Sequence, residues 1–341
     1  MQPSRPASDG RRGLTAQPAP NSVPQTLLIA VVGDIHDAWD QQDSLALKAL
    51  GVDLVLFVGD FGNEAVELVR AVSRLDLPYA AAFGNHDAWY TATPWGTKHC
   101  PYDRSQEDRV RQQLNLLGEA HVGYSHRTFS HLNLSVVGGR PFSWGGPEWR
   151  CAQFYQERFG VGGFAESTAR ITAAATAAPA QTILFLGHNG PTGLGEQAED
   201  PCGKDWQPLG GDFGDWDLRA AIAATQAAGK QIPLVAFGHM HHTLRHTKKV
   251  QRQRLCVDTA GTVYLNAACV PRIVKTNQGL RRNFSLVTLQ DQQVTEVKLV
   301  WLDETFTIVT DPSERVATSE TLYTKSANDL TAPAHYTPSV F

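Results

Sequence analysis

The sequence has few of the features that mark membrane-spanning, disulfide-rich or nucleic-acid-binding proteins. No apolar run approaches the ~18 residues that a transmembrane helix needs, and the first 25 residues contain no apolar segment typical of a secretion signal. The five cysteines are widely spaced and form no CxxC pair, which argues against a disulfide framework or a zinc ribbon and favours reduced thiols in a cytoplasm. The net charge is -4, so neither nucleic acid nor an anionic membrane is expected as a partner.

Proline-rich or polar composition is confined to the two ends of the chain. Residues 1–25 carry five prolines and are expected to form a disordered tail, and the polar composition of 311–341 predicts a second, mostly disordered tail. The intervening segment, 26–310, shows no internal boundary and is long enough to bury one large α/β core. Within it, residues 88–125 and 191–217 interrupt the pattern and are predicted to be cap-like insertions, the second an irregular loop of functional type.

Five apolar runs in this segment each lead into a glycine followed closely by Asp, Asn or His. In the first, LLIAVV at 27–32 leads into Gly33, Asp34 and His36. An unbroken apolar run bounded by glycine is typical of a strand buried on both faces, as in a parallel sheet. Because open α/β sheets bind ligands beyond the carboxyl ends of their strands, the pattern predicts a site at one sheet edge. The other four runs lead into GDFGN at 59–63, GNHD at 84–87, GHNG at 187–190 and GHMHH at 238–242.

The segments between the first three runs predict helices that connect parallel strands. A short helix is expected over Asp43–Leu50, with Gly51 just past its end, and Asn63 is placed to cap a second helix over 64–75. Right-handed crossovers then place the motif loops on one side of the sheet. Closing strands of an antiparallel or mixed sheet are predicted at 262–274, 284–290 and 294–303, with a turn at 290–293.

The motifs bring together side chains with oxygen or imidazole donors and no thiolate, a donor set that suits Mn, Fe, Zn or Ni. Seven ligands exceed what one transition metal takes, whereas two metals sharing a carboxylate, ~3.5–4 Å apart, would use them all and leave positions for water and substrate. Such a pair neutralises charge on a phosphate ester and activates water, and His86 is placed to protonate the leaving alkoxide. The candidate ligands are Asp34, His36, Asp60, Asn85, His188, His239 and His241.

The ordered set DxH, GDxx, GNHD, GH and GHxH resembles the motifs of the calcineurin-like metallophosphoesterases, and the resemblance covers most of 27–300. It implies an α/β fold, a four-layer α/β/β/α sandwich of two mixed sheets. It implies that one metal is bound by Asp34, His36 and His241. A second would be bound by Asn85, His188 and His239, and Asp60 would bridge the two. It also implies in-line attack by hydroxide lying between the metals, with His86 as general acid.

Several polar side chains near the motifs admit two interpretations. Asp87 either orients a histidine of the site, as a catalytic residue, or caps a helix. Asn63 and the GHNG motif depart from the commoner residues of the family, which leaves the substrate class open. Arg140 is interpreted as a surface salt bridge, with contact to a phosphate as the alternative. His121, like the other histidines outside the motifs, is expected at the surface or hydrogen-bonded.

Two longer segments of the sequence also admit two interpretations each. The basic run 245–254 is expected to be a solvated loop or a rim that steers anions toward the site. The aromatic residues of the first insertion, among them Trp89 and Trp95, are expected to pack the cap rather than to stack on bases.

Three functions are compared on this basis. The favoured one is a metal-dependent hydrolase of a small phosphorylated substrate, either a phosphomonoester or a phosphodiester. The alternative is a non-catalytic protein-interaction module on the same fold, which tends to lose the acid histidine or a ligand; here His86 and all seven ligand positions are present. A nuclease lacks support because the sequence shows no extensive basic face.

Overall fold

The computed structural model describes residues 26–310 in full and the backbone of 320–324. The predicted tails lie outside the described residues, except that strand β14 (Glu320–Thr324) falls within the second and pairs with β12 (Gln293–Leu302). In the part of the chain that is described, no helix is both long and apolar enough to cross a bilayer.

Helices and strands alternate through the first three quarters of the chain, and strands dominate the last quarter. The remaining strands are β1 (Thr26–Val32), β2 (Leu54–Phe57), β3 (Tyr79–Ala81), β4 (His126–Phe129), β5 (Leu134–Gly138), β6 (Thr182–Leu186), β7 (Gln231–Phe237), β8 (Leu255–Val257), β9 (Val263–Asn266), β10 (Ile273–Thr276), β11 (Gly279–Gln290) and β13 (Ile308–Val309). The helices are α1 (Gln41–Leu50), α2 (Val66–Val72), α3 (Trp89–Ala92), α4 (Pro94–Lys98), α5 (Arg109–Leu117), α6 (Ala152–Phe159), α7 (Phe164–Ala177) and α8 (Trp216–Ala227).

The first sheet has eight strands and is mixed. Strands β1, β2 and β3 are parallel, as the strand-helix-strand pattern predicts, with α1 and α2 in the connections. On the other side of β1 the long strand β11 is antiparallel to both β1 and β12. The β11–β12 hairpin turns at Asp291 and Gln292, which confirms the predicted closing pair and its turn.

The second sheet has six strands and is also mixed. Its four central strands, β5, β6, β7 and β9, are parallel, and antiparallel strands β4 and β8 form the edges. Strand β9 comes from the segment predicted as a closing strand, but it joins the parallel strands of this sheet and is separate from the β11–β12 hairpin.

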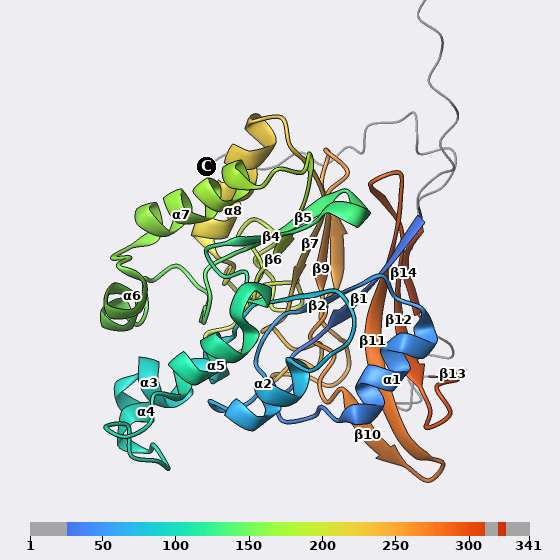
Figure 1. Cartoon of the computed structure of the whole chain (residues 1–341), viewed down its shortest axis with the longest axis horizontal. Coiled ribbons are helices and arrows are strands. Elements are labelled where there is room, and N and C mark those ends of the chain that lie inside the picture. Colours follow the sequence, from blue (N-terminus) through green and yellow to red (C-terminus); the bar gives the residue numbers. More distant parts are fainter. Residues whose placement is uncertain (1–25, 311–319, 325–341) are drawn as a thin grey trace, which may run out of the picture.

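The two sheets pack face to face, with helices on the outer face of each. Along β1, Leu27, Ile29 and Val31 point into the layer between the sheets, whereas Ala30 and Val32 point to the layer beneath α1 and α2. This alternation follows from the two-residue period of a strand, and burial on both faces explains the unbroken apolar run. Helices α7 and α8 cover the six-stranded sheet through a third apolar layer. Figure 1 shows these helices and α1 and α2 on opposite sides of the molecule, which confirms the predicted α/β/β/α sandwich.

Two predicted helices differ in detail from the structure. Helix α1 is capped by the side chain of Asp40 and ends at Gly51, whose φ of 69° is the left-handed conformation favoured by glycine. Helix α2 begins only at Val66, after Ala65, without a side-chain cap. The prediction that Asn63 caps this helix is therefore wrong, because its side chain is engaged with His86 in the site described below.

Candidate metal centre

All five motif loops follow the carboxyl ends of parallel strands and meet at one edge of the sandwich. Three follow β1, β2 and β3 of the eight-stranded sheet, and two follow β6 and β7 of the other. Backbone hydrogen bonds join neighbouring loops: His36 donates to the carbonyl oxygen of Asp60 (2.7 Å), and Gly238 donates to that of His188 (2.7 Å). Across the sheets, Nδ1 of His188 lies 2.9 Å from the carbonyl oxygen of Val58.

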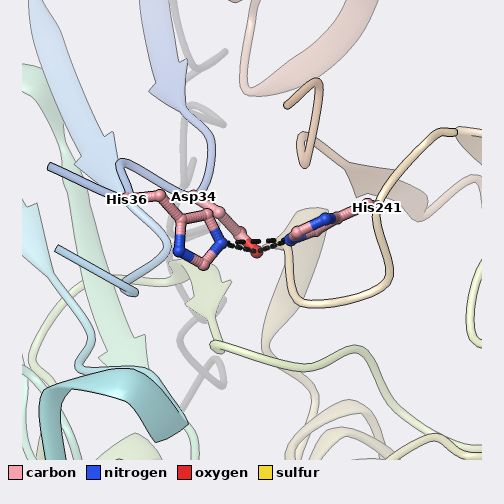
Figure 2. A group of neighbouring side chains, drawn as sticks. All are labelled: Asp34, His36 and His241. Atoms are coloured by element: carbon pink, nitrogen blue, oxygen red, sulfur yellow. Dashed lines mark hydrogen bonds and ion pairs between the residues drawn. The ribbon is translucent and has the colours of Figure 1, made fainter. Parts of the chain in front are cut away.

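Asp34, His36 and His241 form a first cluster, shown in Figure 2. The Nε2 atoms of the two histidines are 3.1 Å apart. Asp34 Oδ2 lies 3.3 Å from Nε2 of His241 and 3.9 Å from Nε2 of His36. The two imidazoles lie on either side of the Asp34 carboxylate, one on the loop after β1 and the other on the loop after β7 (Figure 2). Three donor atoms from two distant parts of the sequence thus converge on one small volume.

A second cluster contains Asp60, Asn85, His188 and His239. Nε2 of His188 lies 3.0 Å from Oδ1 of Asn85, 3.1 Å from Nδ1 of His239 and 3.4 Å from Oδ1 of Asp60. Because a carbonyl oxygen only accepts, the contact with Val58 places a hydrogen on Nδ1 of His188. Nε2 is then the ring nitrogen that faces Oδ1 of Asn85, and it can bind a metal ion once it carries no hydrogen.

A metal cation would accept lone pairs from both Nε2 of His188 and Oδ1 of Asn85, which lie 3.0 Å apart. The four side chains of the second cluster offer two imidazole nitrogens, one carboxylate and one amide oxygen, a donor set suited to a transition metal. The first cluster offers two imidazoles and a carboxylate. The residues present in both clusters thus fit bound metal ions.

Asp60 lies between the two clusters. Its Oδ2 atom is 3.8 Å from Nε2 of His36 in the first cluster, and its Oδ1 atom is 3.4 Å from Nε2 of His188 in the second. Oδ1 also accepts a hydrogen bond of 2.9 Å from the backbone N–H of His86. The carboxylate is 2% exposed, so it is held at the junction of the clusters and away from bulk water.

Asp34 is fully buried and remains a carboxylate. Burial raises the pKa of Asp34, but the hydrogen bond from His241 and the charges of His188, His241 and His36 outweigh it and hold the pKa well below its usual range. The backbone N–H of His239 lies 3.1 Å from both carboxylate oxygens. Burial and the neighbouring His188 lower the pKa of His239, so its ring is neutral and able to bind a metal.

The backbone at three of the candidate ligands is in the left-handed region, which is uncommon for residues with a side chain. The φ angles are 42° at His36, 49° at Asp60 and 67° at His239. Such conformations cluster at functional sites, where they aim side chains that a regular turn would place elsewhere. Gly84 and Gly238 add a second constraint, because a Cβ there would lie 2.2 Å from Asp60 Oδ1 and 2.1 Å from Asp34 Oδ1, respectively.

His86 lies beside Asp60, at the rim of the site. Its Nε2 atom is 4.0 Å from Oδ2 of Asp60, and its Nδ1 atom is 2.6 Å from Oδ1 of Asn63. One face of the ring stacks on Trp89, with 4.5 Å between ring centroids, and Trp89 stacks in turn on Trp144. Burial is the main influence that lowers the pKa of His86, outweighing the opposite effect of Asp60.

Asp87 is fully buried, and its contacts are with backbone amides rather than with a histidine. One carboxylate oxygen accepts from the N–H of Gly84 (2.7 Å) and the other from the N–H of Phe61 (2.9 Å). Burial, together with the nearby Asp60, raises the pKa of Asp87 well above its usual value. Of the two interpretations offered by the sequence, these contacts favour capping: Asp87 ties the loop after β2 to the loop after β3.

Arg140 forms a salt bridge, as interpreted from the sequence, but the salt bridge is buried and not at the surface. The side chain is 2% exposed, with Nη2 2.8 Å from Asp215 and Nε 3.0 Å from Asp217. It joins the end of β5 to the end of the irregular segment 191–217, whose last two residues begin α8.

The basic run 245–254 is only partly a solvated loop, because Arg252 is buried and donates to three backbone carbonyls of 198–203.

Asn63 and the Trp89–Trp144 stack are the parts of the site that the sequence did not reveal. The signal for Asn63 is its place at the end of the GDFGN motif, four residues after Gly59, which follows β2. For Trp89 the signal is its spacing of three residues from His86, which places both on one side of a helical turn.

The chain is thus an α/β/β/α sandwich of two mixed sheets, with two candidate metal-binding clusters at one edge. A sequence profile of the calcineurin-like phosphoesterases matches residues 27–243 of this chain. The chain therefore belongs to the calcineurin-like phosphoesterase family. A search of curated proteins found no match.

Several solved structures resemble this one at low sequence identity. A dimetal phosphatase from Danio rerio is 11% identical, with a TM-score of 0.44 over 88% of this chain and 99% of that chain. A purple acid phosphatase from yellow lupin is 13% identical, with a TM-score of 0.41 over 93% of this chain and 57% of that one. A metallophosphoesterase from Sphaerobacter thermophilus is 15% identical, with a TM-score of 0.35 over 82% and 89%.

Proposed function

We propose that this chain is a dinuclear-metal hydrolase of phosphate esters. In this proposal Asp34, His36 and His241 hold one metal ion, and Asn85, His188 and His239 hold the other. Asp60 is shared. The observation that carries the proposal is the convergence of potential ligand atoms from both sheets, above all the 3.0 Å approach of His188 Nε2 to Asn85 Oδ1.

Two bound transition-metal ions would neutralise the phosphoryl charge and activate a water molecule at neutral pH. The protein supplies the remaining chemistry. His86 is proposed as the general acid that protonates the leaving alkoxide. Because Asn63 Oδ1 only accepts, Nδ1 of His86 carries a hydrogen, and the proton to be transferred is the one on Nε2 of the protonated ring. Asp87 has no proposed proton-transfer step; it holds the two loops that carry Asp60 and His86.

The proposed substrate is a small phosphorylated molecule, either a phosphomonoester or a phosphodiester. The candidate metals are Mn, Fe, Zn and Ni, which the imidazole and carboxylate donors suit. A cytoplasmic location is proposed because all five cysteines are free thiols in the structure, a state that a reducing compartment maintains. Cell fractionation tests the location.

The experiment combines elemental analysis of purified protein with assays on p-nitrophenyl phosphate and its bis ester. We expect about two transition-metal ions per chain and turnover of at least one ester. Asp60→Asn should lose both metal and activity, because the shared carboxylate serves both clusters. Asp76→Asn is the matched control, since Asp76 is exposed and pairs with Lys48. Metal-loaded protein that turns over neither ester would favour the non-catalytic interaction module, and protein that binds no metal would refute the proposal.

A further inference from the structure

A buried glutamate connects the loop after β2 to the turn that carries His86. Glu64 directly follows Asn63 and is 0% exposed. Its φ of 53° lies in the left-handed region, which is uncommon for a residue with a side chain. Its backbone N–H donates to the carbonyl oxygen of His86 (3.1 Å). Glu64 is therefore tied directly to the segment of chain that bears the candidate acid.

Two hydrogen-bond donors of the first insertion, 88–125, converge on the carboxyl group of Glu64. The backbone N–H of Thr91 donates to Oε1 (2.7 Å), and the hydroxyl group of Tyr102 donates to Oε2. Thr91 lies in α3, two residues after Trp89, whereas Tyr102 lies between α4 and α5. One carboxyl group thus holds two separate parts of the insertion against the loop after β2.

Tyr102 extends this connection to the helices on either side of it. The guanidinium of Arg109, the first residue of α5, lies 3.9 Å from the centroid of the Tyr102 ring. The ring of Tyr90, in α3, packs edge-on against the same ring with 6.2 Å between centroids. The segment from α3 to the start of α5 is therefore linked through Tyr102 to Glu64.

A buried carboxyl group is an unfavourable way to anchor an insertion by packing alone. Within 26–310 no Lys, Arg or His side chain forms an ion pair with Glu64, and burial raises the pKa of its carboxyl group. An apolar side chain would fill this space without loss of hydration. A hydrogen bond, however, fixes direction and distance, and the one from Thr91 holds the turn of α3 from which Trp89 stacks on His86.

We propose that Glu64 is a positioning residue, which keeps the Trp89 indole stacked on His86 and so keeps the acid oriented. Its backbone holds the carbonyl group of His86, and its side chain holds the helix that carries Trp89. Glu64 belongs to neither metal-binding cluster, so its effect on turnover is exerted through His86. The inference rests on the proposed function, because it assigns Glu64 to the proton transfer made by His86.

The test compares wild type with Glu64→Ala, both full-length and zinc-loaded, on two esters. Glu64→Ala should lower kcat on glycerol 2-phosphate, which has a poor leaving group, by about 10- to 100-fold, as expected when an orienting partner is lost. The loss on p-nitrophenyl phosphate should be smaller, because that leaving group needs little protonation. KM and the metal content should stay close to those of wild type.

Two further variants keep the insertion packed if Glu64→Ala does not fold. Glu64→Gln should recover most of the lost kcat, because an amide can accept from Thr91 and donate to the Tyr102 hydroxyl. Tyr102→Phe removes one of the two hydrogen bonds and should show a smaller loss with the same dependence on the leaving group. Glu67→Ala is the matched control, because Glu67 is exposed and pairs with Arg70.

Histidine-labelled protein gives a readout that does not depend on activity. The ring current of Trp89 should move the Cε1–H resonance of His86 upfield, and Glu64→Ala should return it toward that of a solvated histidine. An unchanged His86 resonance in Glu64→Ala, or equal losses of kcat on the two esters, would overturn this inference alone. Wild type that turns over neither ester would instead refute the proposed function, and with it the assignment of Glu64 to proton transfer.

Discussion

Oδ1 of Asn63 lies 2.6 Å from Nδ1 of His86, and this contact joins the GDFGN motif to the GNHD motif. It fixes which ring nitrogen carries a permanent hydrogen, because an amide oxygen cannot donate. The stacked indole of Trp89 restrains the same ring from its face. The orientation of His86 is thus determined from two directions before any substrate binds.

Replacement of Asn63 tests whether this contact orients the acid. Asn63→Ala should lower kcat by about 10- to 100-fold, the usual cost of losing an orienting partner, while the metal content stays at the wild-type level. Asn63→Asp should retain more activity and move the alkaline limb of the kcat profile to higher pH, because a carboxylate raises the pKa of a neighbouring imidazole. Equal pH profiles for Asn63→Asp and wild type would contradict the proposed role.

Removal of His86 tests the proton transfer itself. His86→Ala should reduce kcat on an ester with a poor leaving group by ~10²–10⁴-fold, the range expected of a general acid. On p-nitrophenyl phosphate the loss should be smaller, since that leaving group needs little protonation. Elemental analysis should show unchanged metal. A loss that is equal for both leaving groups would remove His86 from the acid role.

The fold and the convergence of the candidate ligands could be predicted because both follow from local patterns. Unbroken apolar runs identify strands buried on both faces, and strand β1 alternates between two apolar layers as such a strand must. Polar residues after those runs then share a sheet edge. Arg140 could not be placed in this way, because its partners Asp215 and Asp217 are some 75 residues away on an irregular segment with no periodic signal.

Asn63 shows a different limit of prediction from the sequence. Its residue type and its position before an amphipathic stretch are those of a helix cap, which is why the sequence predicted one. The side chain instead contacts His86, which lies in the turn after β3, and the helix starts without a side-chain cap. A tertiary contact overrode a local preference, and only the three-dimensional arrangement of β2 and β3 reveals it.

A methyl group at Gly84 should disrupt the centre without altering any ligand. The Cβ of Gly84→Ala would lie 2.2 Å from Asp60 Oδ1 and 2.5 Å from the His188 ring, so one of these groups must move. We expect a loss of bound metal and at least a ten-fold loss of activity, measured by elemental analysis and kcat/KM. Gly163→Ala is the control, because its extended backbone has open space for a Cβ. Wild-type metal content in Gly84→Ala would contradict the packing argument.

Arg140 should stabilise the fold rather than contribute to turnover. Asp215 and Asp217 raise the pKa of Arg140, against the opposing effect of burial, so the guanidinium stays charged. Arg140→Met leaves two buried carboxylates without their partner and should cost about 3–5 kcal/mol of unfolding free energy in urea titrations. Arg70→Met, which removes an exposed pair with Glu67, should cost about 0–1 kcal/mol. Similar losses of unfolding free energy for the two variants would show that the buried ion pairs of Arg140 stabilise the fold no more than an exposed pair does.

His121 should make the fold sensitive to acid. The residue was expected at the surface or hydrogen-bonded, but its Nε2 is buried and has no partner among the described residues, and its ring lies 4.9 Å from that of Phe83. Burial lowers the pKa of His121 to about 4. In the unfolded chain the pKa of His121 is ~6.5, so as the pH falls the unfolded chain takes up a proton before the folded chain does.

It follows that His121 makes the folded state progressively less stable as the pH falls from the unfolded pKa toward the folded one, and its effect is complete below about pH 4. At pH 5 the loss attributable to this residue should be roughly 1–2 kcal/mol relative to pH 7. His121→Phe keeps an aromatic ring against Phe83 but cannot titrate, so its unfolding free energy should fall less between pH 7 and pH 5. Because both proteins keep the same candidate ligands, the difference between them isolates His121, and parallel pH curves in urea titrations would refute the assignment.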